Sequence, residues 1–172
     1  MEQRDRQQLQ RYTSRPFPSY RYIPFQGDMP HPRNDPDGHS YGHEDDYLPV
    51  FSARQWMDCQ PYLYGVDLFN RGYWWEAHEA WENVWLAAGR GTQTGMFIQG
   101  LIQIAAAQLK RVMHEDQGAK LLTVSGIEKL NICKGRFLGI DIARLTAQAE
   151  AALQQDVNVF VPLITLSLPL EP

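Results

Sequence analysis

Residues 68–85 read LFNRGYWWEAHEAWENVW and hold four of the five tryptophans of the chain, together with one histidine and three carboxylates. A helix from Tyr73 to Ala88 turns by about 100° per residue, which gives this segment one continuous apolar face. The face consists of Trp74, Ala77, Trp81, Val84 and Trp85. The pattern predicts an amphipathic helix at the centre of a helical domain.

Polar residues share that apolar face. His78 and Glu82 are four residues apart, so their side chains meet on a helix. Glu79 lies at the edge of the face, whereas Glu76 and Asn83 are expected to point to water. A carboxylate among aromatic rings needs a partner, because burying an unpaired charge is costly. The partner of Glu82 is His78, a metal ion or a basic residue of another helix.

The composition sets limits on the class of protein. A chain of 172 residues with 44% hydrophobic and 12% aromatic residues suits one domain with a bulky core. The net charge of −4 and the lack of a Lys/Arg block argue against a nucleic-acid surface. Two distant cysteines, Cys59 and Cys133, suit the reducing cytosol and are expected to fill the core.

Residues 1–15 are polar and unlike a secretory signal, and the apolar runs 100–109 and 157–170 contain glutamine or proline. We therefore expect a soluble, cytoplasmic protein without a membrane span or a nucleic-acid partner. A homo-oligomer or a protein partner is left open.

The apolar periodicity predicts an all-α fold, with a single-domain bundle of four to five helices over residues 49–156. Proline, glycine and capping residues place the helix ends. Ser52 and Asp141 are expected to cap helices, Thr92 or Thr94 to start one, and residues 70–72 to form a break between two. The expected helices cover residues 52–60, 62–70, 73–88, 92–113, 119–134 and 142–155, the first of them short. The helix over 92–113 is apolar around more than half its circumference, so we expect it to be central, with Gln99, Gln103 and Lys110 as its polar stripe.

Two extended segments flank the bundle. The tail over 157–172 is apolar, and no second strand is expected to pair with it. The arm over 1–48 is expected to start with a short polar helix over Met1–Tyr12, after which six prolines exclude regular structure. Its aromatic residues predict partial docking on the bundle. Its histidines, His31, His39 and His43, lie among acids with no recognisable metal-site spacing, which favours a solvated or docked loop.

Several segments resemble the family catalogued as domain of unknown function 309, which is a set of bacterial and archaeal proteins. The matching pieces are residues 68–73, 76–85, 99–103 and 118–122, and the resemblance covers roughly 61–132. It implies a small all-helical bundle and a motif of His, three residues, Glu, two residues, then Trp or Tyr. This motif falls on His78, Glu82 and Trp85, and in the family it is suggested to bind metal without an established activity.

The stretch His78–Glu82 also resembles the helix motif of zinc proteases, with Glu82 in place of the second histidine. A metal would need further ligands, for which Glu79, His114 and the arm histidines are candidates. Zinc, iron or manganese would suit carboxylate and imidazole ligands. A ferritin-like di-iron site is excluded, because the chain has no Glu-x-x-His motif. Four further residues are candidates for lining the site: Trp75, Trp85, Gln99 and Gln103.

Two rival interpretations are open. In one, the domain is a non-catalytic scaffold or interaction module, because the segment from Asn70 to Trp81 resembles a tetratricopeptide hairpin. His78 and Glu82 are then a structural pair that reaches Gln99, Gln103 or a backbone carbonyl. In the other, the two residues form a catalytic pair without metal, in which His78 is the general base. The leading prediction is binding of a divalent metal or a small polar ligand at His78 and Glu82, with hydrolysis as one option. Neither a substrate nor a reaction follows from the sequence.

Overall fold

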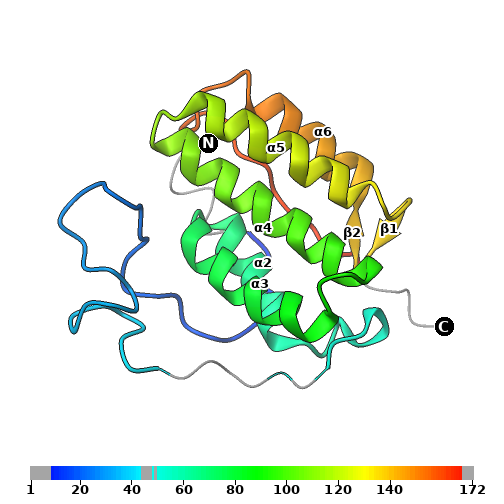
Figure 1. The fold of residues 1–172 in the computed structure, drawn as a ribbon, viewed down its shortest axis with the longest axis horizontal. Coiled ribbons are helices and arrows are strands. Elements are labelled where there is room, and N and C mark those ends of the chain that lie inside the picture. The colour runs from blue at the N-terminus through cyan, green and yellow to red at the C-terminus, as the bar shows by residue number, and fades with distance from the viewer. Residues whose placement is uncertain (1–8, 44–47, 49, 168–172) are drawn as a thin grey trace.

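The computed structural model describes residues 9–43, 48 and 50–167, and over these residues the fold is all-α, as predicted (Figure 1). Its elements, in order along the chain, are the 3-10 turn η1 (Ala53–Gln55), α2 (Gln60–Asn70), α3 (Trp74–Ala88), α4 (Gln93–Val112), α5 (Asp116–Leu130), β1 (Arg136–Phe137), β2 (Ile140–Asp141) and α6 (Ile142–Ala152).

Helix α4 lies at the centre of the bundle, between α3 and α5, while α2 packs on α3 and α6 on α5 (Figure 1). Its first turn is capped by Thr92, whose hydroxyl accepts a hydrogen bond from the Gly95 amide. Helices α4 and α5 approach closely where two glycines face each other. A Cβ added to Gly100 would lie only 3.0 Å from the carbonyl oxygen of Gly126. The central position predicted for residues 92–113 is therefore confirmed.

The tryptophan-rich helix α3 is fixed by its apolar stripe. Trp81 is fully buried, and its indole N–H donates to the carbonyl oxygen of Tyr62 at 3.1 Å. Tyr62 is also fully buried, and its hydroxyl donates to the carbonyl oxygen of Leu138 at 2.7 Å. These bonds satisfy the polar ends of two aromatic side chains inside the core.

Three expectations about the elements are wrong. The helix expected over 52–60 is a single 3-10 turn, and the Ser52 hydroxyl donates to the Gln55 side chain instead of capping a helix. Of the helix expected over Met1–Tyr12, residues 9–12 are not helical, and residues 1–8 lie outside the described part of the chain. The tail has a strand partner after all, since Leu166 forms a bridge with Ile140.

That partner belongs to a short hairpin that the sequence analysis did not predict. Strands β1 and β2 pair with Arg136 opposite Asp141 and Phe137 opposite Ile140. The turn uses left-handed backbone at Leu138 (φ 47°) and Gly139 (φ 77°), which is typical of tight hairpins. Two-residue strands are too short to produce an alternating pattern.

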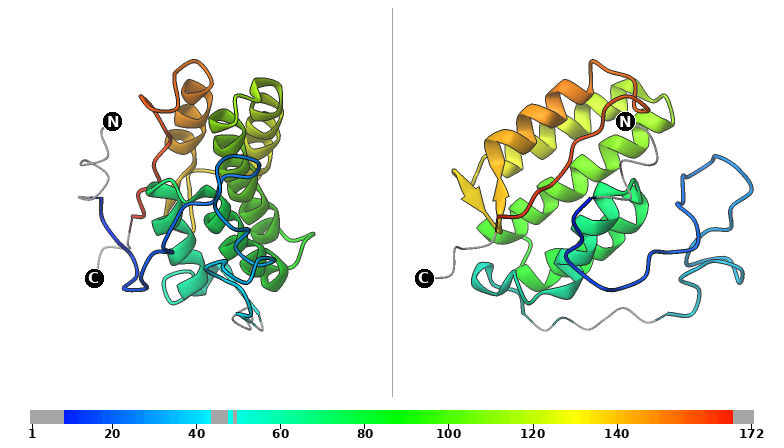
Figure 2. Two further views of the ribbon diagram at one scale, coloured as in Figure 1. Left: turned by 90° about the vertical axis from the view of Figure 1, so that its left-hand side faces the viewer. Right: turned by 180° about the vertical axis from the view of Figure 1, so that it is seen from behind.

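Parts of the arm lie along α2 and α3, whereas a loop of it projects away from the helices, with Phe25 97% exposed (Figures 1 and 2). Asp67 on α2 has no exposed surface and accepts hydrogen bonds from the amides of Tyr12 and Thr13, at 2.9 Å each. The Phe17 ring stacks on Tyr73 with centroids 5.5 Å apart. No helix among the described residues is long and apolar enough to cross a bilayer.

Candidate metal centre

The position of α3 in the bundle decides which of its side chains reach solvent. Its buried apolar residues recur every three or four positions and face α2 and α4: Trp74, Ala77, Trp81, Val84 and Ala88. His78, Glu79 and Glu82 are partly exposed, with 24%, 23% and 45% of each side chain accessible. They therefore lie on the flank of the helix and not inside the aromatic face.

These three side chains form the one group of three or more potential metal ligands found among the described residues. One ligand atom from each lies within 4.8 Å of the others. The His78 Nδ1 is 3.5 Å from Glu79 Oε1, and its Nε2 is 3.4 Å from Glu82 Oε1. His78 Nδ1 is buried and has no hydrogen-bond partner in the described part of the chain. The two ring nitrogens thus face two different carboxylates.

The carboxylates dominate the electrostatics of the imidazole. Burial lowers the pKa of His78, but the adjacent Glu79 and Glu82 outweigh this effect and raise the pKa above its ordinary value. The His78 ring in turn holds the pKa of Glu79 below its ordinary range, against the effect of burial, with a further contribution from Arg33. The two carboxylates therefore stabilise the protonated form of the His78 ring.

The structure does not bring every candidate residue to the cluster. His114 is exposed beyond the C-terminus of α4 and lines a separate cavity with Arg111 and Asp116. Gln99 and Gln103 are half-buried on α4, and the buried Gln103 Oε1 has no hydrogen-bond partner within the described residues.

The two candidate tryptophans lie on either side of the cluster along α3. The Trp75 ring centroid is 5.8 Å from that of His78. Trp85 is half-buried, and the Arg90 guanidinium lies over its ring at 4.9 Å. Trp75 is therefore the aromatic residue in contact with the histidine of the motif.

The arm approaches the cluster from outside the helical domain. The Arg33 Nε lies 2.8 Å from Glu79 Oε2, so this carboxylate is shared between His78 and the arm. His31 packs edge-on against Trp75 with centroids 5.6 Å apart, and Tyr22 contacts the same ring at 5.2 Å. None of the three arm histidines joins the group of potential ligands.

A second carboxylate of α3 holds the arm. Glu76, expected to face water, is only 6% exposed, because the arm covers it. Its Oε1 accepts a hydrogen bond from the Tyr22 amide at 2.9 Å and lies 3.1 Å from His39 Nε2. Burial raises the pKa of Glu76, although the Tyr22 amide and the His39 ring partly oppose this effect.

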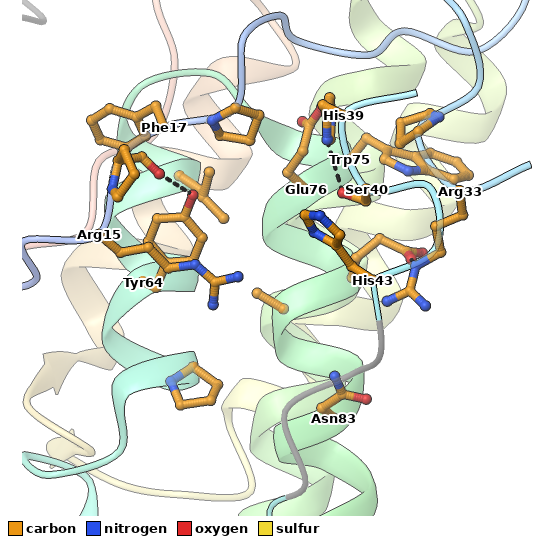
Figure 3. A pocket seen from close by; sticks show the side chains of 17 residues that line it. Arg15, Phe17, Arg33, His39, Ser40, His43, Tyr64, Trp75, Glu76 and Asn83 are labelled. Atoms are coloured by element: carbon orange, nitrogen blue, oxygen red, sulfur yellow. Dashed lines mark hydrogen bonds and ion pairs between the residues drawn. The ribbon is translucent and has the colours of Figure 1, made fainter. Parts of the chain in front are cut away.

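A cavity of about 310 Å³ lies between the arm and helices α2 and α3 (Figure 3). Arg15 and Tyr64 flank one side, and His39, Ser40 and Glu76 flank the other, with the Arg15 guanidinium and the His43 ring turned towards the space between. Glu79 also lines it. The cavity therefore borders the cluster without including His78 or Glu82.

Sequence reasoning missed three charged residues that join the arm to the helices: Arg33, Asp67 and Glu76. One of them carried a signal, because Asp67 is the single charged residue within the apolar run 61–70 and so required a buried partner. Arg33 and Glu76 gave none, since their partners are 46 and 54 positions away in the chain, at Glu79 and Tyr22 (79 − 33 and 76 − 22).

The segment that contains the site matches a known protein family. The family described as Domain of unknown function (DUF309) matches residues 62–122, which include all three residues of the cluster. None of the curated proteins matches the chain.

Proposed function

The chain carries a domain of the DUF309 family over residues 62–122, and we propose that this domain binds one divalent cation through His78, Glu79 and Glu82. The observation that carries the proposal is the convergence of one imidazole and two carboxylates within 4.8 Å on a single helix flank. One nitrogen and two oxygen donors suit manganese, ferrous iron or zinc.

Exposure of the three side chains supports an open site. Because roughly a quarter of His78 and Glu79 and almost half of Glu82 are accessible, water or a polar ligand can complete the coordination sphere. A cation with an open position polarises a bound carbonyl or water, which is the basis of metal-assisted hydrolysis. Hydrolysis at this site would therefore require the cation to bind.

Cation binding requires a small rearrangement of side chains. A single ion takes only one nitrogen of the His78 ring, so either Glu79 or Glu82 must turn from its present contact towards the ion. Both are glutamates on the partly exposed flank of α3, and rotamer changes of such side chains need no backbone movement.

The test is elemental analysis of protein purified without a histidine tag, combined with Mn²⁺ and Zn²⁺ titration. We expect about one ion per chain, lost in His78→Ala and in Glu82→Ala while the far-UV circular dichroism is unchanged. Glu128→Ala, at an exposed glutamate of α5 outside the cluster, is the matched control and should retain the ion. Absence of any ion both from the wild-type protein and from Arg33→Ala, which frees Glu79 from its contact with the arm, would overturn the proposal.

A structural brace is the second candidate, because the contacts already form a continuous chain of charges. Arg33 pairs with Glu79, Glu79 with His78, and His78 with Glu82. Such a chain needs no cation and would serve a non-catalytic scaffold or interaction domain. On this account His78→Ala and Glu82→Ala lower the stability of the protein, and neither the variants nor the wild type binds metal.

A further inference from the structure

The contact between Arg33 and Glu79 places a fixed positive charge on one of the three ligands of the cluster. The guanidinium occupies Glu79 Oε2 at 2.8 Å, while Glu79 Oε1 faces His78. Arg33 comes from the arm, outside the segment that the family matches. The Glu79 carboxylate can therefore either pair with Arg33 of the arm or act as a ligand in the cluster of the helical domain.

Arg33 is held in place from both sides along the arm. Eleven residues before it (33 − 22), the Tyr22 amide donates to Glu76 Oε1, and six residues after it (39 − 33), the His39 ring contacts the same oxygen. Both His39 and Glu76 are nearly buried, with 8% and 6% of their side chains exposed. The neighbouring Pro32 is also buried. The segment carrying Arg33 is thus a docked loop whose two ends meet at one carboxylate of α3.

We propose that the arm is an inhibitory segment of the metal centre, in which Arg33 withholds Glu79 from the cation. The inference rests on the proposed function, because it needs the cluster of His78, Glu79 and Glu82 to bind a divalent ion. A guanidinium and a divalent ion within a few ångströms of the same carboxylate repel each other, and the carboxylate cannot pair fully with both. The ion binds with all three ligands when Arg33 leaves Glu79.

Removal of the Arg33 charge tests the competition directly. The measurement is isothermal titration of full-length protein with Mn²⁺, for wild type, Arg33→Ala and the control Arg21→Ala. Arg21 is an exposed arm residue whose guanidinium lies 6.0 Å from the Tyr73 ring. We expect Arg33→Ala to bind Mn²⁺ about 3- to 10-fold more tightly than wild type, and Arg21→Ala to bind as wild type does.

Linkage supplies a second, independent measurement. If arm docking weakens ion binding, then ion binding weakens arm docking by the same factor. Hydrogen exchange of the Tyr22 amide, which is bound to Glu76, should accelerate on addition of saturating Mn²⁺, and exchange in α5 should be unchanged.

Each outcome bears on a different part of the inference. Equal Mn²⁺ affinity in wild type and Arg33→Ala, or unchanged exchange at Tyr22, would overturn the inhibitory role and leave the metal centre intact. Absence of Mn²⁺ binding from wild type and from Arg33→Ala would overturn both. Binding by Arg33→Ala alone would support both, with inhibition nearly complete in the wild type.

Discussion

Gly65 on α2 and Trp81 on α3 show how little space the core leaves for a single added atom. A Cβ at Gly65 would lie 2.2 Å from the Trp81 indole nitrogen, which donates to the Tyr62 carbonyl. Trp81 is fully buried, so its ring cannot move aside into solvent. The approach of α2 to α3 therefore depends on the absence of a side chain at position 65.

We predict that Gly65→Ala lowers the free energy of unfolding by about 3 kcal/mol, because the added methyl group displaces the Trp81 ring and strains its hydrogen bond. Urea denaturation followed by tryptophan fluorescence measures the change. Gly91→Ala is the control, since a Cβ there meets no atom within 4 Å, and its effect should stay within about 0.5 kcal/mol. Equal stability of the two variants would contradict this account of the packing.

Contacts between side chains of one helix were predictable from the sequence, and contacts between the arm and the helices were not. The approach of His78 to Glu82 follows from their spacing of four residues on α3. The same helical geometry placed Glu76 in water, because it takes no account of a segment that arrives from elsewhere in the chain. Burial of Glu76 by Tyr22 and His39 is a tertiary contact that no local pattern records.

At the scale of elements, helix ends follow local chemistry when a side chain provides the cap. The Asp141 carboxylate accepts a hydrogen bond from the Arg144 amide at 3.0 Å, which satisfies one free N–H at the start of α6. The sequence analysis predicted this cap, and it named Thr92 as one of two threonines that could start α4. The β1–β2 hairpin was missed, since its identity depends on a tight turn and on the tail strand that adds to it.

We predict that Asp141→Ala lowers the free energy of unfolding by about 1 kcal/mol, because it leaves the first turn of α6 without its acceptor. Asp141→Asn should stay within a few tenths of a kcal/mol of wild type, since the amide oxygen can accept the same bond. Thermal denaturation of both variants measures the difference. A loss of the same size in the asparagine variant would show that the negative charge matters and the hydrogen bond does not.

At the scale of the whole molecule, both cysteines lie in the continuous core. Cys59 precedes α2 and is 6% exposed, while Cys133 follows α5 and is 2% exposed. Burial raises the pKa of both thiols. The thiolate is the reactive form, so the raised pKa makes each thiol less reactive, and burial keeps reagents in solution away from it.

We predict that both thiols of the folded protein react with an aromatic disulfide reagent at least 100-fold more slowly than in 6 M guanidinium chloride, an order of magnitude set by the need to open the core. Absorbance of the released thiolate measures the rate at pH 8. Rapid reaction of one thiol with the circular dichroism unchanged would show that its end of the core opens locally.

The fold class was predictable because four helices carry strong apolar periodicity in the sequence. The contacts that join distant segments were not, because they depend on single polar groups. The Asn70 side chain, for example, donates to the Ile164 carbonyl at 2.7 Å and accepts from the Ile164 amide at 2.8 Å. The sequence analysis read Asn70 only as part of the break between two helices, although it also attaches the tail to α2.

Docking of the arm on helices made later in the chain has a consequence during synthesis on the ribosome. The arm leaves the ribosome before its binding surface exists, since the Tyr22 amide needs Glu76 and the Tyr12 amide needs Asp67. At about 5–20 residues added per second, the delay between synthesis of the arm and synthesis of its partners on the helices lasts several seconds. During that interval the aromatic residues of the arm stay uncovered and accessible to chaperones that bind nascent chains.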